Sequence, residues 1–177
     1  MIRSMRLPLL NQVRMLLLAA WLGAAIYFSA VVAPSVFGVL RSFSLTNANE
    51  IAGTVVTRTL AIVNVSGFVL TVLLVASTFV LKKSYGRASF TFQIVLLAII
   101  ATATGLGEWV IASRMRGLRA AMHGQIDQVA LTDPNRVAFA ALHGYSVSAL
   151  AIAIIAGLIA FFVIANRFKS SHRQVTS

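Results

Sequence analysis

The sequence has 177 residues, 59% of them hydrophobic and only 11% charged, and its mean hydropathy is +0.89. Soluble domains carry about 25% charged residues, so this composition excludes an ordinary soluble enzyme or binding module. The net charge is +11 and cysteine is absent, which excludes disulfides and thiolate metal sites; the basic residues flank apolar runs, a pattern of membrane orientation and not of nucleic-acid binding.

Four segments are long and apolar enough to cross a bilayer. A hydrocarbon core of about 30 Å requires about 20 residues of apolar helix, and lone strands would leave backbone groups unpaired in lipid. The predicted fold class is therefore all-α, an integral membrane four-helix bundle. The helices are predicted over about 12–40, 48–82, 88–118 and 134–168, within a single membrane domain 1–177 that ends in a basic tail at 169–177.

Local signals predict where several helices begin and end. Asp133 can cap the last helix, and Pro134 fits the first turn of that helix. Asn47 and Glu50 resemble a capping box for the second helix. Pro34 is expected to kink or end the first helix. The second and fourth helices are long enough to project beyond the bilayer on the outer side.

Basic residues are distributed unequally between the two sides of the predicted membrane. The side that holds both termini and the connection near Lys82 has nine basic residues and no acidic ones. The other side has six basic residues and all four acidic ones. The positive-inside rule therefore predicts that both termini are cytoplasmic and that the basic side meets anionic lipid headgroups.

Small residues recur four apart and are expected to hold the bundle together, because helices in lipid associate by close packing. A homodimer face, in a homo-oligomer or a larger membrane complex, is the alternative. These residues are Ala25, Ser29 and Ala33 in the first helix, Ala101 and Gly105 in the third, and Ala149, Ala153 and Gly157 in the fourth.

Polar residues from three helices share a depth near the outer boundary of the hydrocarbon. Arg58 lies 24 positions from Lys82, and His143 lies 24 positions from Arg167, which is about 36 Å of helix in each case. An ionisable residue in a membrane segment suggests a functional site. The alternative interpretation is structural: these residues form ion pairs that only lower the energetic cost of placing charges near lipid. The candidate cluster is Arg58, Glu108, His143, Arg114, Arg136 and Asn64.

Metal binding and catalysis have weaker support. His143, His123, Met115 and Met122 are weak candidates for reduced copper, because imidazole and thioether suit that ion. Their spacing is not that of a metal motif, so neither a metal nor another cofactor is expected. Ser146 and Ser148 lie near His143, but no acid–base relay is visible, so catalytic residues are not predicted and the chain is not expected to be an enzyme.

The sequence resembles the bacterial relatives of transmembrane protein 205, a family of four-pass proteins with a domain of unknown function, and is distantly similar in plan to copper-resistance D membrane proteins. The resemblance implies a bacterial inner-membrane location and emphasises Pro34, Arg58 and His143, without an established reaction. It is carried by Trp21–Gly23 with Val32–Phe37, by Ala52–Gly53 with Arg58, by the region of Arg114, and by Phe139–Ser146.

The functional expectation is a non-enzymatic membrane protein, either an accessory subunit or one that binds or senses a small solute through the polar cluster. A small transporter or a copper-handling or copper-resistance protein is the alternative. A membrane enzyme comes third and would require Glu108 and His143 to share a proton.

Overall fold

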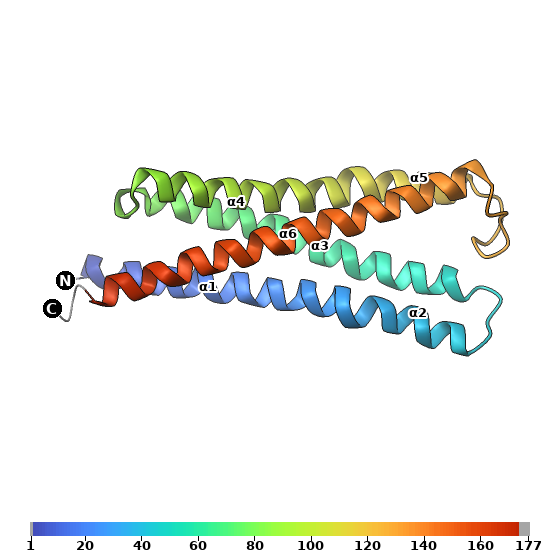
Figure 1. Ribbon diagram of the computed structural model, residues 1–177, viewed down its shortest axis with the longest axis horizontal. Coiled ribbons are helices and arrows are strands. Elements are labelled where there is room, and N and C mark those ends of the chain that lie inside the picture. Colours follow the sequence, from blue (N-terminus) through green and yellow to red (C-terminus); the bar gives the residue numbers. More distant parts are fainter. Residues whose placement is uncertain (1, 174–177) are drawn as a thin grey trace.

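A bundle of four long helical rods makes up the protein in the computed structural model, which describes residues 2–173 and the side chains of residues 9–83 and 85–166 (Figure 1). Residues 174–177 of the predicted basic tail lie outside the described residues. In chain order the elements are α1 (Ile2–Tyr27), the π-helix η1 (Phe28–Val32), α2 (Ala33–Ser42), α3 (Ala48–Val80), the 3-10 turn η2 (Lys82–Ser84), α4 (Arg87–Gly105), the π-helix η3 (Leu106–Ala112), α5 (Ser113–Ala121) and α6 (Pro134–Arg173).

The fold prediction is confirmed: the protein is all-α, and its four long apolar helices pack as a bundle. Leu9–Ser42, Ala48–Val80, Arg87–Ala121 and Pro134–Asn166 are each long and apolar enough to span a membrane. With 33 residues α3 is about 50 Å long, more than a hydrocarbon core of about 30 Å. The other three rods are at least as long, so each can rise beyond the bilayer.

The first rod differs most from its predicted course. It begins at Ile2 rather than near residue 12, and it does not end at Pro34 but continues to Ser42. The turn before Pro34 is wound as a π-helix, in which the Ala33 N–H bonds to the carbonyl of Phe28 five residues earlier. Proline has no N–H to donate and its ring crowds the preceding turn, and the wider π turn accommodates this defect without breaking the rod.

The two predicted helix caps have different outcomes. Asp133 caps α6 as predicted, because its Oδ1 accepts hydrogen bonds from the backbone N–H of Asn135 at 2.8 Å and of Arg136 at 3.2 Å. The capping box at the start of α3 is wrong, since the Asn47 side chain makes no capping hydrogen bond. The carboxylate of Glu50 instead binds the guanidinium of Arg119 on α5, a charged partner that outcompetes a neutral N–H.

An indole ring packed between two glycines lies in the bundle core. Trp21 is buried, and its Nε1–H donates to the carbonyl of Val63 on α3 at 3.0 Å. A Cβ at Gly67 would come within 2.6 Å of that Nε1, and a Cβ at Gly157 would come within 3.3 Å of the same ring. Two of the predicted small residues, Ala25 and Ala153, are fully buried in this core, which is the close packing that holds helices together in lipid.

The two ends of the bundle differ in their connections. At one end, here called the basic end, α1 begins, η2 joins α3 to α4, and α6 ends (Figure 1). At the other, here called the loop end, residues 43–47 join α2 to α3 and residues 122–133 join α5 to α6. There α6 packs chiefly on η3 and α5 rather than on α2, so its outer turns have one neighbouring rod instead of two.

Candidate functional site

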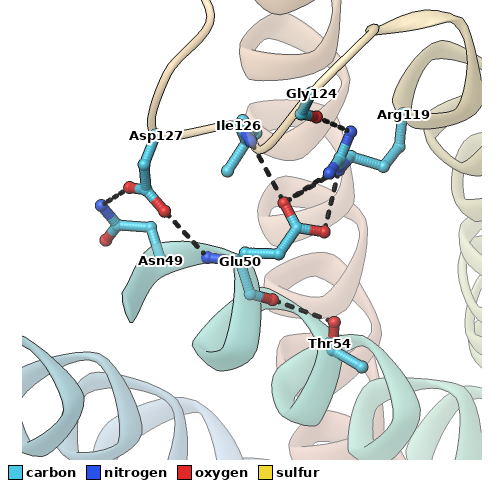
Figure 2. Close-up of polar contacts among 7 residues, drawn as sticks. All are labelled: Asn49, Glu50, Thr54, Arg119, Gly124, Ile126 and Asp127. Carbon is cyan, nitrogen blue, oxygen red and sulfur yellow. Dashed lines mark hydrogen bonds and ion pairs between the residues drawn. The ribbon is translucent and has the colours of Figure 1, made fainter. Parts of the chain in front are cut away.

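A carboxylate at the start of α3 anchors the long connection at the loop end. The Glu50 carboxylate accepts hydrogen bonds from Nε and Nη2 of Arg119 at 2.7–3.0 Å, and from the backbone N–H of Ile126 at 3.2 Å (Figure 2). Arg119 also donates to the carbonyl of Gly124 at 3.0 Å. Both side chains of the ion pair are about seven-tenths buried, so solvent screens the pair only in part.

A second carboxylate extends this group of contacts. Asp127 accepts hydrogen bonds from the Asn49 amide at 2.5 Å and from the backbone N–H of Glu50 at 3.3 Å (Figure 2). Asn49 in turn accepts one from Nε of Arg41 at 3.0 Å. These contacts, together with the Glu50–Arg119 pair, form what we call the clasp. Its groups satisfy one another, so the clasp has a structural role and uses two of the four acidic residues in the chain.

Glu108 and Asn64, two residues of the predicted cluster, lie at neighbouring positions inside the bundle. Glu108 is buried within the π-helix η3, and its Oε1 is 3.4 Å from Nη1 of Arg116. Asn64 is buried on α3 against the adjacent Gly107, where a Cβ would lie 3.2 Å from Asn64 Nδ2. π-Helical turns are frequent at functional sites, so Glu108 and Asn64 stay candidate site residues.

Arg58 and His143 point elsewhere. Both are exposed, and no hydrogen bond or ion pair joins either of them to Glu108 among the side chains that the structure describes. Arg58 comes two residues after the buried Val56, which is about 200° around the helix and therefore on the opposite face. His143 lies on the part of α6 that has only one neighbouring rod.

The remaining sequence candidates are separate from one another. Arg136 donates to the carbonyl of Val129 in the adjoining loop, and Arg114 is exposed. Of the weak metal candidates, His123 is exposed, Met122 is buried and Met115 is half-buried. Within the described part of the chain, no three histidine or carboxylate side chains come together to hold a metal ion.

Two grooves follow one another along the seam between the third rod and α6. The first, of about 490 Å³, is almost wholly apolar and runs from Val95 on α4 to Ile111 in η3, opposite Ala149 and Ile152 on α6. The second, of about 550 Å³, continues one turn further on. It is lined by Arg114, Gly117 and Leu118 on α5 and by Ala138, Ala141, Leu142 and Tyr145 on α6.

This seam is a shallow, open site on the described surface. From Val95 to Arg114 it covers 19 residues of helix, or about 28 Å, close to the thickness of a hydrocarbon core. Its first groove is apolar and lies along the membrane-spanning length, and Arg114, its one cationic side chain, lies about one turn beyond that groove, where the second groove begins. Arg114 makes no hydrogen bond or ion pair with another described residue. The seam can hold an elongated apolar group with a negative charge at one end.

At the basic end of the bundle lies a buried arginine whose burial was not predicted from the sequence. Arg14 counts among the flanking basic residues, yet it is 1% exposed and bonds to Thr78 and Tyr85 inside the bundle. The signal that could have found it is helical spacing. Arg14 lies four residues before Leu18 and seven before Trp21, so it shares the face of α1 that enters the core.

The apolar rods, their length and their packing define a multi-pass membrane protein with four transmembrane helices. The chain belongs to the family described as Domain of unknown function (DUF4149), which it matches over residues 16–124. No curated protein and no solved structure matches it. The matched region takes in most of the first span, all of the second and third spans, and the Glu50–Arg119 pair, whereas α6, which completes the seam, begins after it.

Proposed function

We propose that this protein is a non-enzymatic membrane protein that binds one amphiphile, with an anionic headgroup and an acyl chain, in the seam between the third rod and α6. The observation that carries the proposal is the position of Arg114, a cation without a partner among the described residues, about one turn beyond an apolar groove that covers 16 residues of helix, or about 24 Å. An acyl chain matches the apolar part, and a phosphate group is the natural partner of a guanidinium.

The hydroxyl groups inside the bundle favour binding over transport. Thr71 and Thr104 are buried, and each donates its hydroxyl hydrogen to a carbonyl of its own helix at 2.7–2.8 Å. Ser66, an exposed residue of α3, likewise donates to the carbonyl of Val63 at 3.1 Å. Hydroxyls used in this way do not line a polar path, which a transporter of polar solutes would require. We therefore place transport and copper handling second.

The location forms part of the same proposal. We infer a bacterial inner membrane, as the likeness to the transmembrane protein 205 relatives implies, with both termini in the cytoplasm and the loop end outside. The charge distribution supports this orientation. Because the chain has no cysteine, single cysteines can test it. Leu131→Cys in the long connection should react with a membrane-impermeant maleimide in intact cells, whereas Lys83→Cys should react only after permeabilisation; the reverse pattern contradicts the orientation.

Lipid binding can be measured directly by native mass spectrometry of the purified protein with phosphatidylglycerol or phosphatidylcholine. We expect preferential retention of phosphatidylglycerol, and about tenfold or more weaker binding in Arg114→Met, because one charge-assisted hydrogen bond is lost. Ala98→Phe, which fills the exposed apolar groove, should also weaken binding.

Arg58→Met is the matched control, because Arg58 is also an exposed arginine, at a similar depth on α3 and away from the seam. It should bind phosphatidylglycerol like the wild type. Equal affinities of Arg114→Met and Arg58→Met would show that the anionic lipid is attracted by net charge alone, and the proposal would fail.

A further inference from the structure

A guanidinium is enclosed by neutral groups at the basic end of the bundle. Arg14 on α1 is 1% exposed. Its Nη2 donates to Thr78 Oγ1 at 2.6 Å, and its Nη1 donates to the Tyr85 hydroxyl at 2.6 Å and more weakly to Asn11 at 3.4 Å. The Thr78 hydroxyl in turn donates a hydrogen bond to the carbonyl of Leu74 at 2.7 Å. The partners fix the position of the arginine without neutralising its charge.

No acidic side chain of this chain can serve as the counter-ion. The four acidic residues are Glu50, Glu108, Asp127 and Asp133, and all of them belong to the other half of the bundle. Glu108, which comes nearest, is 15 residues along the third rod from the level of Gln93, or about 22 Å. Arginine is almost never fully buried unless it is paired. The charge of Arg14 therefore lacks a compensating carboxylate among the described residues.

Helical spacing places a second buried polar side chain in the same layer. Leu18, Leu74 and Leu97 are core residues of α1, α3 and α4. Two contacts place these parts of the helices near one level: Arg14 bonds to Thr78 at 2.6 Å, and the ring centroids of Phe79 on α3 and Phe90 on α4 are 5.4 Å apart. One turn toward the basic end, at four residues from each leucine, these helices carry Arg14, Thr78 and Gln93. All three are at most 2% exposed. A polar layer thus lies directly below a leucine layer.

Three buried polar atoms of this layer have unused hydrogen-bonding capacity within the described part of the chain. Both amide atoms of Gln93 and the Nε of Arg14 are buried, and none has a hydrogen-bond partner among the described residues. A buried polar group without a partner costs about 1–3 kcal/mol, and such groups are rare in folded proteins. The unused N–H groups and the uncompensated positive charge lie in one layer and call for the same kind of ligand.

We propose that this layer is a binding site for a phosphate oxyanion. The anion neutralises Arg14, accepts a hydrogen bond from its Nε–H and another from the Gln93 amide, and takes the position at Nη1 that the Tyr85 hydroxyl now holds. Tyr85 is half-buried in the short connection between α3 and α4, so a swing of this side chain opens the layer from the end of the bundle. The exposed Lys82 and Lys83 beside it raise the local concentration of anions.

The test is thermal unfolding of the full-length protein in dodecyl maltoside, with inorganic phosphate titrated against chloride at constant ionic strength. We expect a melting temperature that rises and saturates with phosphate. Arg14→Met should lower the apparent affinity for phosphate about tenfold or more, as expected for lost charge-assisted hydrogen bonds. Arg87→Met is the matched control, because Arg87 is an exposed arginine at the same end, and it should respond like the wild type.

Gln93→Leu separates a binding role from a purely structural one. It removes two unpartnered buried atoms and should therefore raise the melting temperature without phosphate, while it reduces the phosphate-induced shift. A variant that is more stable but keeps the full shift contradicts the proposal. Where inorganic phosphate stabilises the wild type, an Arg14→Met protein whose response to phosphate equals that of Arg87→Met also contradicts it. A wild type that inorganic phosphate does not stabilise contradicts it if phosphatidic acid, tested below, does not stabilise the protein either.

The source of the phosphate group is distinguished by a lipid arm. The same proteins are reconstituted in phosphatidylcholine vesicles with or without phosphatidic acid. Stabilisation by inorganic phosphate assigns the site to the free anion. Stabilisation only by phosphatidic acid, lost in Arg14→Met and kept in Arg87→Met, assigns it to a lipid headgroup. Stabilisation by neither overturns the proposal.

Discussion

Gly67 lies against the indole of Trp21, and the replacement Gly67→Ala tests how tightly the core is packed. A Cβ at this position would be 2.6, 2.7 and 2.8 Å from three atoms of the ring, whereas ordinary contacts begin at 3.4 Å. The ring would have to retreat by about 0.8 Å, the difference between 3.4 and 2.6 Å. That movement would stretch the hydrogen bond from Nε1 to the Val63 carbonyl, now 3.0 Å.

The net effect follows from three contributions. Overpacking a well-filled core costs about 1–3 kcal/mol, and weakening the indole hydrogen bond costs up to about 1 kcal/mol more. The higher helix propensity of alanine returns about 1 kcal/mol. We therefore expect Gly67→Ala to lower the free energy of unfolding by up to about 3 kcal/mol. Gly23→Ala is the control, since nothing lies within 4 Å of its Cβ, and it should be neutral or slightly stabilising.

The assay is reversible unfolding in mixed dodecyl maltoside and dodecyl sulfate micelles, followed by circular dichroism. Combining Gly67→Ala with Trp21→Phe should recover part of the loss, because the smaller ring leaves room for the methyl group. The reasoning about the core is refuted if Gly67→Ala is as stable as Gly23→Ala, or if the two substitutions at Trp21 and Gly67 have strictly additive effects.

Two further predictions concern the loop end. Arg119→Met should destabilise the protein by about 1–3 kcal/mol, because it leaves the partly buried Glu50 without its ion pair, and it should speed proteolysis of the 122–133 connection. Arg58→Met, which removes an exposed arginine without an ion pair to another described residue, should do neither. Asp133→Ala should lower the thermal stability by about 0.5–2 kcal/mol through loss of the α6 cap, measured by the same unfolding assay, and an effect no larger than that of Thr132→Ala would contradict the capping role.

The location of the helices along the chain could be predicted, because the hydrophobic effect acts on length and composition alone. Charge-free runs and the Asp133–Pro134 cap indicated most helix ends to within a few residues. The start of α1 could not be predicted in this way, because residues 2–11 are not uniformly apolar and their helix is continuous with a span that begins further on. Depth along each helix was equally accessible, since the rise per residue is constant.

The rotation of each helix was not accessible from the sequence. In lipid all faces of a spanning helix are apolar, so no polar face marks the side that turns outward. Arg58 therefore shares a depth with Glu108 but not a face. The two π-helices add to the difficulty, because a turn with an extra residue rotates everything beyond it by about 100° relative to a regular helix. Such turns at Phe28–Val32 and Leu106–Ala112 had no clear signal beyond Pro34.

The clasp has a consequence for the biogenesis of the protein. Glu50 and Arg119 are 69 residues apart, and between them lie one complete hairpin of spanning helices and the short connection at the opposite membrane surface. Spanning helices insert first and associate afterwards. Glu50 must therefore wait, without its partner, until the third rod has crossed the bilayer and brought Arg119 to the same side. Closure of the clasp thus requires that the first three rods have crossed the bilayer, and it can precede the crossing of α6, the last span in the chain.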